Sequence, residues 1–200
     1  MRSRAPNRLP LLCALLCGVA GCVSGRIPPN LYVLTPPATD AVPAQATGDV
    51  RHLYVDPVRL PDFLDSTDLL VRRGPAEVVP SPTGRWGERL AAGIHDALVT
   101  DLRERLPAGT LIEARDRDPL ARHLAVSVTA FDAWANGHVV LVASWTLVAG
   151  LHGEQLAADQ GTFSIPAAAS PAHDGDAAIV AAMTAALAAL SDRLAGSGLR

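Results

Sequence analysis

Thiols are scarce in this 200-residue sequence, and all of them lie near its start. The chain has three cysteines, Cys13, Cys17 and Cys22, and none follows the last of them. The rest of the chain therefore has no disulfide framework, cysteine nucleophile or cysteine metal ligand. Its stability must come from packing, and this length is enough for one domain with a substantial core.

Lysine is absent, and all 17 basic residues are arginine, against 20 acidic residues. Arg2, Arg4 and Arg8 precede the first apolar run, and no acidic residue occurs before Asp40. Removing these three arginines leaves 14 basic against 20 acidic side chains, a net of −6 in residues 22–200. That balance excludes a broad basic surface, so we expect no nucleic-acid partner.

Catalytic and metal-binding motifs are also missing: the chain has no G-x-S-x-G, H-E-x-x-H, C-x-x-C or P-loop pattern. Two aspartate pairs, Asp116 with Asp118 and Asp174 with Asp176, lack the glycine and final glutamate of a calcium loop, which favours solvated turns or helix caps. The histidines have no metal-ligand spacing, and we expect surface or strand-end residues. They are His52, His95, His123, His138, His152 and His173. We predict no catalytic residue and no metal site.

The apolar run Leu9–Cys22 is too short to span a bilayer core of roughly 30 Å and follows three arginines, which is typical of an export signal. It ends V-A-G-C at 19–22, which resembles the lipobox of bacterial lipoproteins. The resemblance implies a signal peptide over 1–21. It also implies diacylglycerol and an N-acyl chain on Cys22 as the only attached groups. The alternatives are an ordinary signal peptide or a buried segment with a chance Gly-Cys.

Residues 22–30 contain glycine and two prolines and predict a short tether, followed by a single domain over 31–200. Apolar and alternating segments predict about five or six strands. The segments are 31–34, 50–60, 68–73, 124–134, 139–149 and 155–165, with 76–79 and 111–112 as shorter candidates.

Two segments have a helical period instead. Residues 85–106 repeat apolar side chains every fourth position, which predicts an amphipathic helix of about five turns. A final helix, capped by Asp174 or Asp176, reaches about Ala195. The apolar stripes are Trp86, Leu90, Ile94, Leu98, Leu102 and Leu106 in the first helix, and Ile179, Met183, Leu187, Leu190 and Leu194 in the second.

Asn136-Gly137 is a strong signal for a two-residue hairpin loop, which would pair Ala135 with His138. One face of the hairpin would then be apolar and covered by helices. On the other face only about half of the side chains would be apolar. The first holds Leu124, Val126, Val128, Trp134, Val139, Leu141, Trp145 and Leu147; the second holds Ser127, Thr129, Phe131, Val140, Val142, Ser144 and Thr146.

These elements predict an α/β fold: a single domain with a mixed, mostly antiparallel sheet covered by two long amphipathic helices. A two-layer α+β arrangement is the alternative. Several motifs accompany the pattern: L-Y-V-L at 31–34, V-D-P-V-R-L-P-D-F-L-D at 55–65 and R-W-G-E-R-L at 85–90, with the hairpin over 125–147 and the alanine-rich end.

In this order the motifs resemble the PqiC-type (YmbA-like) auxiliary lipoproteins of ABC-like and MCE-type lipid transport systems. The resemblance covers nearly the whole chain after Cys22. It departs at Gly87, where alanine is expected, and glycine would weaken a first helical turn by up to ~1 kcal/mol.

The resemblance implies a non-enzymatic lipoprotein of the outer membrane, facing the periplasm, that docks an MCE-domain protein and inner-membrane transport components. Val23 after Cys22 agrees with outer-membrane sorting in enteric bacteria. The alternative is a periplasmic module that itself binds and carries lipid, and a periplasmic hydrolase is a distant third. An elongated apolar pocket between sheet and helices would favour lipid carriage, and a closed sheet without one would favour docking.

Phe63 and Leu64 are the residues that most need explaining, because they form an apolar pair between Asp62 and Asp65 in a predicted turn. Core packing and contact with a partner protein are both open for this pair, and Asp62 and Asp65 would belong to the same partner contact. Trp86 heads a leucine stripe, which favours a place in the core.

Overall fold

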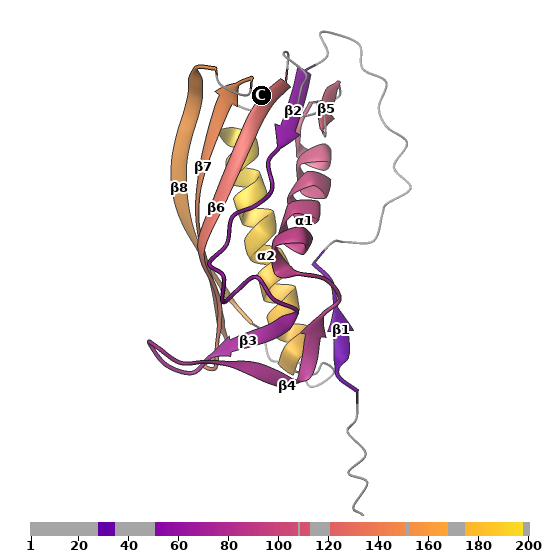
Figure 1. The fold of residues 1–200 in the computed structure, drawn as a ribbon, viewed down its shortest axis with the longest axis vertical. Coiled ribbons are helices and arrows are strands. Elements are labelled where there is room, and N and C mark those ends of the chain that lie inside the picture. Colours follow the sequence, from indigo (N-terminus) through magenta and orange to yellow (C-terminus); the bar gives the residue numbers. More distant parts are fainter. Residues whose placement is uncertain are drawn as a thin grey trace, which may run out of the picture.

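Figure 1 shows the computed structural model, in which a mixed sheet of eight strands is backed by two helices. The structure describes residues 28–34, 51–107, 109–112, 121–150, 153–167 and 175–197. The strands are β1 Asn30–Tyr32, β2 Arg51–Val55, β3 Asp68–Arg72, β4 Val78–Trp86, β5 Thr110–Ile112, β6 Ala121–Trp134, β7 His138–Ala149 and β8 Gln155–Pro166; the helices are α1 Leu90–Arg105 and α2 Gly175–Gly196. Outside the described residues lie the predicted signal peptide and six predicted residues, Cys22, Asp116, Asp118, Asp174, His152 and His173.

The long strand β6 organises the sheet. One of its edges pairs antiparallel with β7, which in turn pairs antiparallel with β8. Its other edge is shared, because β2 runs parallel to residues 121–124 and β3 runs parallel to residues 133–134. The sheet then continues from β2 to β5 and from β3 through β4 to β1. The predicted mixed α/β domain is confirmed. The sheet has more strands than the six expected, because the shorter candidates at 76–79 and 111–112 also correspond to strands, β4 and β5.

Both helices pack with the inward face of the sheet around one core. Helix α2 lies on β7 and β8, and α1 packs against α2. The predicted stripes are confirmed, since their central members are at most 2% exposed. The largest fully buried side chains include Ile94, Leu98 and Leu102 of α1, Leu187, Leu190 and Leu194 of α2, and Leu124, Phe131, Leu141 and Leu147 of the sheet.

Helix α2 is also long and apolar enough to cross a membrane, by length and composition. In the structure, α2 packs inside the protein core. Leu187, Leu190 and Leu194 are fully enclosed between the sheet and α1, and Asp192 and Arg193 are exposed beside them. The apolar character of α2 is therefore explained by its place in the core.

The predicted start of the first helix is wrong. Trp86 is the last residue of β4, and its N–H donates to Thr67 O (2.8 Å), so Arg85 and Trp86 belong to the sheet. The N–H of Gly87 donates to Tyr32 O (2.7 Å), and a Cβ on Gly87 would lie 3.2 Å from Val33 Cγ1. Gly87 therefore lies between strand and helix and weakens no helical turn. The core position predicted for Trp86 is confirmed, since it is 4% exposed.

The predicted hairpin register is also wrong. Trp134 pairs with His138, so the loop has three residues and Gly137 takes its left-handed position, with φ at 84°. A bulge between Val128 and Ala130 shifts the register again and exchanges the faces beyond it. Phe131 is consequently in the core at 2% exposure. Trp134 is on the outer face, where the guanidinium of Arg72 lies 5.7 Å from its ring centroid.

His123 differs from the expectation of a surface or strand-end residue, because β6 begins three residues earlier than predicted. It lies between Tyr54 of β2 and Val148 of β7 and is 3% exposed. Its Nδ1 is 3.1 Å from Asp56 Oδ1, and its ring centroid is 5.1 Å from that of Tyr54. Its Nε2 has no hydrogen-bond partner among the residues that the structure describes.

Candidate docking site

The turn that begins at Pro61 is the candidate site, and it closes on itself before it reaches β3. The carbonyl of Pro61 accepts hydrogen bonds from Leu64 N–H (2.9 Å) and Asp65 N–H (3.3 Å). The Ser66 hydroxyl then accepts a bond from Asp68 N–H (3.1 Å) at the start of the strand.

The turn separates the two apolar side chains that the sequence groups together. Leu64 is 3% exposed and belongs to the core, whereas Phe63 is 49% exposed on the outside. Asp62 is exposed beside Phe63. Core packing is therefore confirmed for Leu64, whereas partner contact stays a prediction for Phe63 and for Asp62.

Asp65 joins the turn to the N-terminus of α1. Its Oδ1 accepts the N–H of Ala91 (3.1 Å), and its Oδ2 accepts Nε (3.1 Å) and Nη2 (2.6 Å) of Arg89. The carbonyl of Ser66 accepts the N–H of Leu90 (3.2 Å). Arg89, at the N-cap position of α1, makes no side-chain cap, so the turn satisfies the first free N–H groups of the helix from outside it.

This arrangement favours the charged carboxylate. The hydrogen bond from Arg89 lowers the pKa of the Asp65 carboxyl below its ordinary value, and the bond from the Ala91 N–H lowers the pKa further, against the opposing effect of partial burial. The partner contact predicted for Asp65 does not include this role. The local sequence carries no signal for it, because the helix that Asp65 caps begins 25 residues later.

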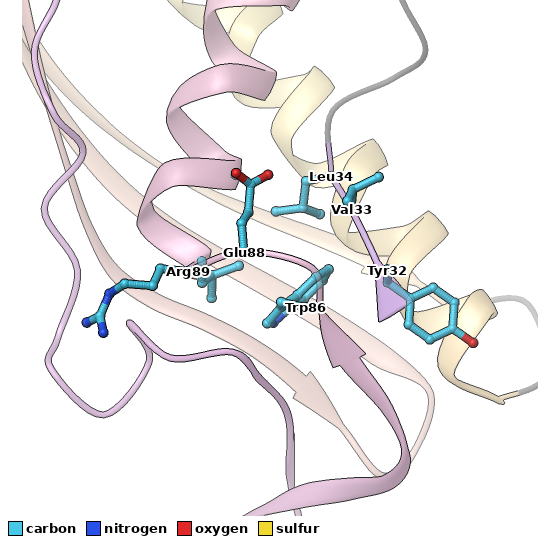
Figure 2. A pocket seen from close by; sticks show the side chains of 8 residues that line it. Tyr32, Val33, Leu34, Trp86, Glu88 and Arg89 are labelled. Atoms are coloured by element: carbon cyan, nitrogen blue, oxygen red, sulfur yellow. The ribbon is translucent and has the colours of Figure 1, made fainter. Parts of the chain in front are cut away.

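An apolar hollow lies on the other side of the start of α1, lined by Tyr32, Val33, Leu34, Trp86, Glu88, Arg89, Leu90 and Gly93. Figure 2 shows Leu34 and Trp86 between β1 and α1, with Arg89 pointing away toward the loop that precedes β3. The hollow does not admit a water molecule. A site for a drug-sized ligand usually has ~300 Å³ or more, so this hollow is too small for a lipid.

A second hollow is polar. It lies between β8 and the end of α2 and is lined by Asp159, Asp192, Arg193, Gly196 and Ser197. Arg193 Nη2 pairs with Asp159 Oδ2 at 2.7 Å. A hydrogen bond from the Gln160 N–H, followed by that from Arg193, lowers the pKa of Asp159. Its charged lining is unsuited to acyl chains.

The predicted acidic and histidine residues do not assemble into a metal centre within the described ranges, where no three potential ligands come together. Asp176, predicted as a solvated turn or a cap, is 7% exposed in the first turn of α2. It accepts hydrogen bonds from the hydroxyls of Ser81 (2.8 Å) and Thr83 (2.6 Å) and so joins α2 to β4.

Residues 32–195 match the sequence model of a family described as the ABC-type transport auxiliary lipoprotein component. The match covers most of the chain, and the chain belongs to this family.

Among proteins of known name, the chain is 28% identical over 129 residues to the intermembrane transport lipoprotein PqiC of Escherichia coli and of Shigella flexneri, which is 64% of this chain and 68% of each relative. Two crystal structures share the fold. One, of an uncharacterised protein, has a TM-score of 0.67 at 22% identity and covers 83% of this chain and 95% of its own. The other, from Xanthomonas campestris, has a TM-score of 0.61 at 19% identity and covers 84% and 93%. The resemblance inferred from the sequence motifs is confirmed.

Proposed function

We propose that this auxiliary lipoprotein is a non-enzymatic docking component of an intermembrane lipid transport system. It is held in the outer membrane by diacylglycerol and N-acyl chains on Cys22 and faces the periplasm. Its partner is an MCE-domain protein that connects it with inner-membrane transport components. The relatives named PqiC are described as intermembrane transport lipoproteins, and this description supports the transport role.

The observation that carries the docking role is the exposure of Phe63 on a turn that cannot easily move. Phe63 is 49% exposed, while Leu64 beside it is buried and Asp65 is tied to α1 by Arg89 and Ala91. An aromatic side chain held in place loses little conformational entropy on binding, which is the property of an interface anchor. The alternative of lipid carriage requires an apolar pocket, and the apolar hollow beside Trp86 is too small for it.

Site-specific crosslinking in living cells tests the partner. A photoreactive benzoylphenylalanine in place of Phe63 should crosslink to the MCE-domain protein, identified by mass spectrometry of the adduct. The same probe in place of Leu111, exposed on β5 far from the turn, is the matched control. Equal yields from the two positions, or no adduct with the MCE-domain protein from Phe63, would contradict docking through this turn.

The anchor has a separate test. Cys22→Ala should block acylation and cleavage of the precursor, whereas the native protein should incorporate radioactive palmitate and remain in the membrane fraction after washing with high salt. Two or three acyl chains hold firmly where one gives only marginal binding. Native protein that is unlabelled and extracted by salt would refute the anchor.

A further inference from the structure

Strand β1 and the residue that follows it, Val33, carry the two most exposed large apolar side chains in the described part of the chain. Leu31 is 71% exposed and Val33 is 58% exposed. Their neighbours face the other way, since Leu34 is 2% exposed and Tyr32 packs against the core. Figure 2 shows Val33 and Leu34 on opposite sides of the chain. We call Leu31 and Val33 the β1 ridge.

The backbone holds the β1 ridge in place. Residues 30–32 pair in parallel with residues 84–86 of β4, and Tyr32 O accepts the N–H of Gly87 (2.7 Å). The ridge is therefore an apolar surface on a paired strand and the residue directly after it, and its exposure does not come from a frayed end. Such surfaces on soluble domains mark contact with a partner or a membrane.

The cationic side chain of Arg85 lies beside the β1 ridge. Arg85 is the register partner of Leu31 across the β1–β4 pair, so both side chains project from the same face of the sheet. The Arg85 side chain is 54% exposed, and its only ion pair among the described residues, with Asp68, is long at 3.7 Å. Its guanidinium is available to a phosphate, which it can bind through two N–H groups.

The short distance along the chain from Cys22 to the β1 ridge indicates which surface the ridge contacts. Nine residues separate Leu31 from Cys22, and a fully extended chain of that length spans at most about 32 Å. In Figure 1, β1 lies at one end of the long axis of the molecule and β5 at the other. An acyl anchor on Cys22 therefore keeps the β1 end near the bilayer and leaves the β5 end free to point away.

We propose that the β1 ridge and Arg85 form the surface on which the domain rests on the phospholipid bilayer. Leu31 and Val33 enter the interfacial layer and Arg85 contacts lipid phosphates. This inference depends on the proposed anchor at Cys22, because two apolar side chains alone bind a membrane too weakly. The anchor makes the second contact intramolecular, with an effective concentration that a free protein does not reach. The contact sets the orientation of the domain relative to its partner.

A single-thiol probe tests the contact, because the chain has no cysteine after Cys22. The mature, acylated protein with Leu31→Cys is labelled with the environment-sensitive dye NBD and reconstituted into vesicles of phosphatidylethanolamine and phosphatidylglycerol. We expect blue-shifted emission, strong quenching by nitroxide lipids and weak quenching by iodide in the buffer. Leu111→Cys on β5 is the matched control and should show the reverse, since Leu111 is 53% exposed at the opposite end.

The outcomes separate this inference from the anchor itself. Protein without an added cysteine should take up no dye, because the sulfur of Cys22 is in a thioether. Dye uptake by that protein would overturn the anchor and the bilayer contact together. If that protein takes up no dye, but iodide quenches the dye at position 31 as strongly as the dye at position 111, the bilayer contact alone would be overturned. A blue shift that grows with the density of protein in the vesicles, without quenching by nitroxide lipids, would indicate contact between copies of the protein. That result would also overturn the proposal.

Discussion

Replacement of Asp65 by alanine tests whether the docking turn is fixed to α1. The hydrogen bond from Ala91 N–H acts as a helix cap, and loss of a cap typically costs about 1 kcal/mol. The Arg89 side chain is 66% exposed, so its ion pair with Asp65 adds at most about 1 kcal/mol. We expect a loss of about 1 to 2 kcal/mol in the free energy of unfolding, which for a chain of this size lowers Tm by roughly 2 to 8 °C.

The same carboxylate predicts a pH dependence. The hydrogen bond from Arg89 puts the pKa of Asp65 in the folded protein below its value in the unfolded chain. The stability that Asp65 contributes is then fully present above the unfolded pKa of about 4 and is lost as pH falls through the lower folded pKa. The difference in Tm between the native protein and Asp65→Asn should therefore be largest at neutral pH and shrink below about pH 4.

Circular dichroism melts of the detergent-solubilised protein at several pH values measure both effects. Asp62→Ala is the matched control, because Asp62 is exposed on the same turn and its loss should change stability by no more than about 0.5 kcal/mol. Equal shifts for Asp62→Ala and Asp65→Ala, or a difference between native protein and Asp65→Asn that does not vary with pH, would refute the reasoning.

Four further substitutions test the packing, each by urea or thermal unfolding. Leu98→Ala and Leu187→Ala, at 0% and 1% exposure, should each cost about 2 to 5 kcal/mol, and a cost below 1 kcal/mol would show that the helix faces are misassigned. His95→Ala should cost only about 1 kcal/mol, for the bond between its Nε2 and Val55 O (3.2 Å). Gly84→Ala should cost about 1 to 3 kcal/mol, because the new Cβ would lie 2.6 Å from Asp176 Oδ2; an unchanged Tm would contradict this close contact.

The parts of the fold that follow from local pattern could be predicted from the sequence. The stripes of both helices and the long strands of the β6–β7–β8 ladder have periods that only one secondary structure satisfies. The start of α1 could not be predicted, because Trp86 continues the four-residue spacing while its N–H bonds to Thr67, 19 residues earlier. Asn136-Gly137 indicated a turn correctly, but the loop has three residues and places only Gly137 at positive φ.

The candidate site could also be predicted from the sequence only in part. The sequence marks Phe63 and Leu64 as an unusual apolar pair in a turn, and no periodicity within two residues can show which of them faces the core. The outcome depends on the bonds to Pro61 O and on the attachment of Asp65 to α1, which are contacts between distant segments. The exposed β1 ridge was missed because L-Y-V-L is too short to show which alternate residues are buried.

The affinity of the mature protein for the periplasmic part of the MCE-domain protein, compared between native protein and Phe63→Ser, tests the central claim most directly. Full burial of a phenylalanine is worth about 1.5 to 3 kcal/mol, so covering the half that is exposed contributes about 0.75 to 1.5 kcal/mol, or roughly four- to thirteenfold in Kd. We expect Phe63→Ser to weaken binding by that factor and to leave Tm nearly unchanged, with Leu111→Ser as a control that changes neither. An unchanged Kd, or a weakened Kd that accompanies a large fall in Tm, would contradict the docking role of this turn.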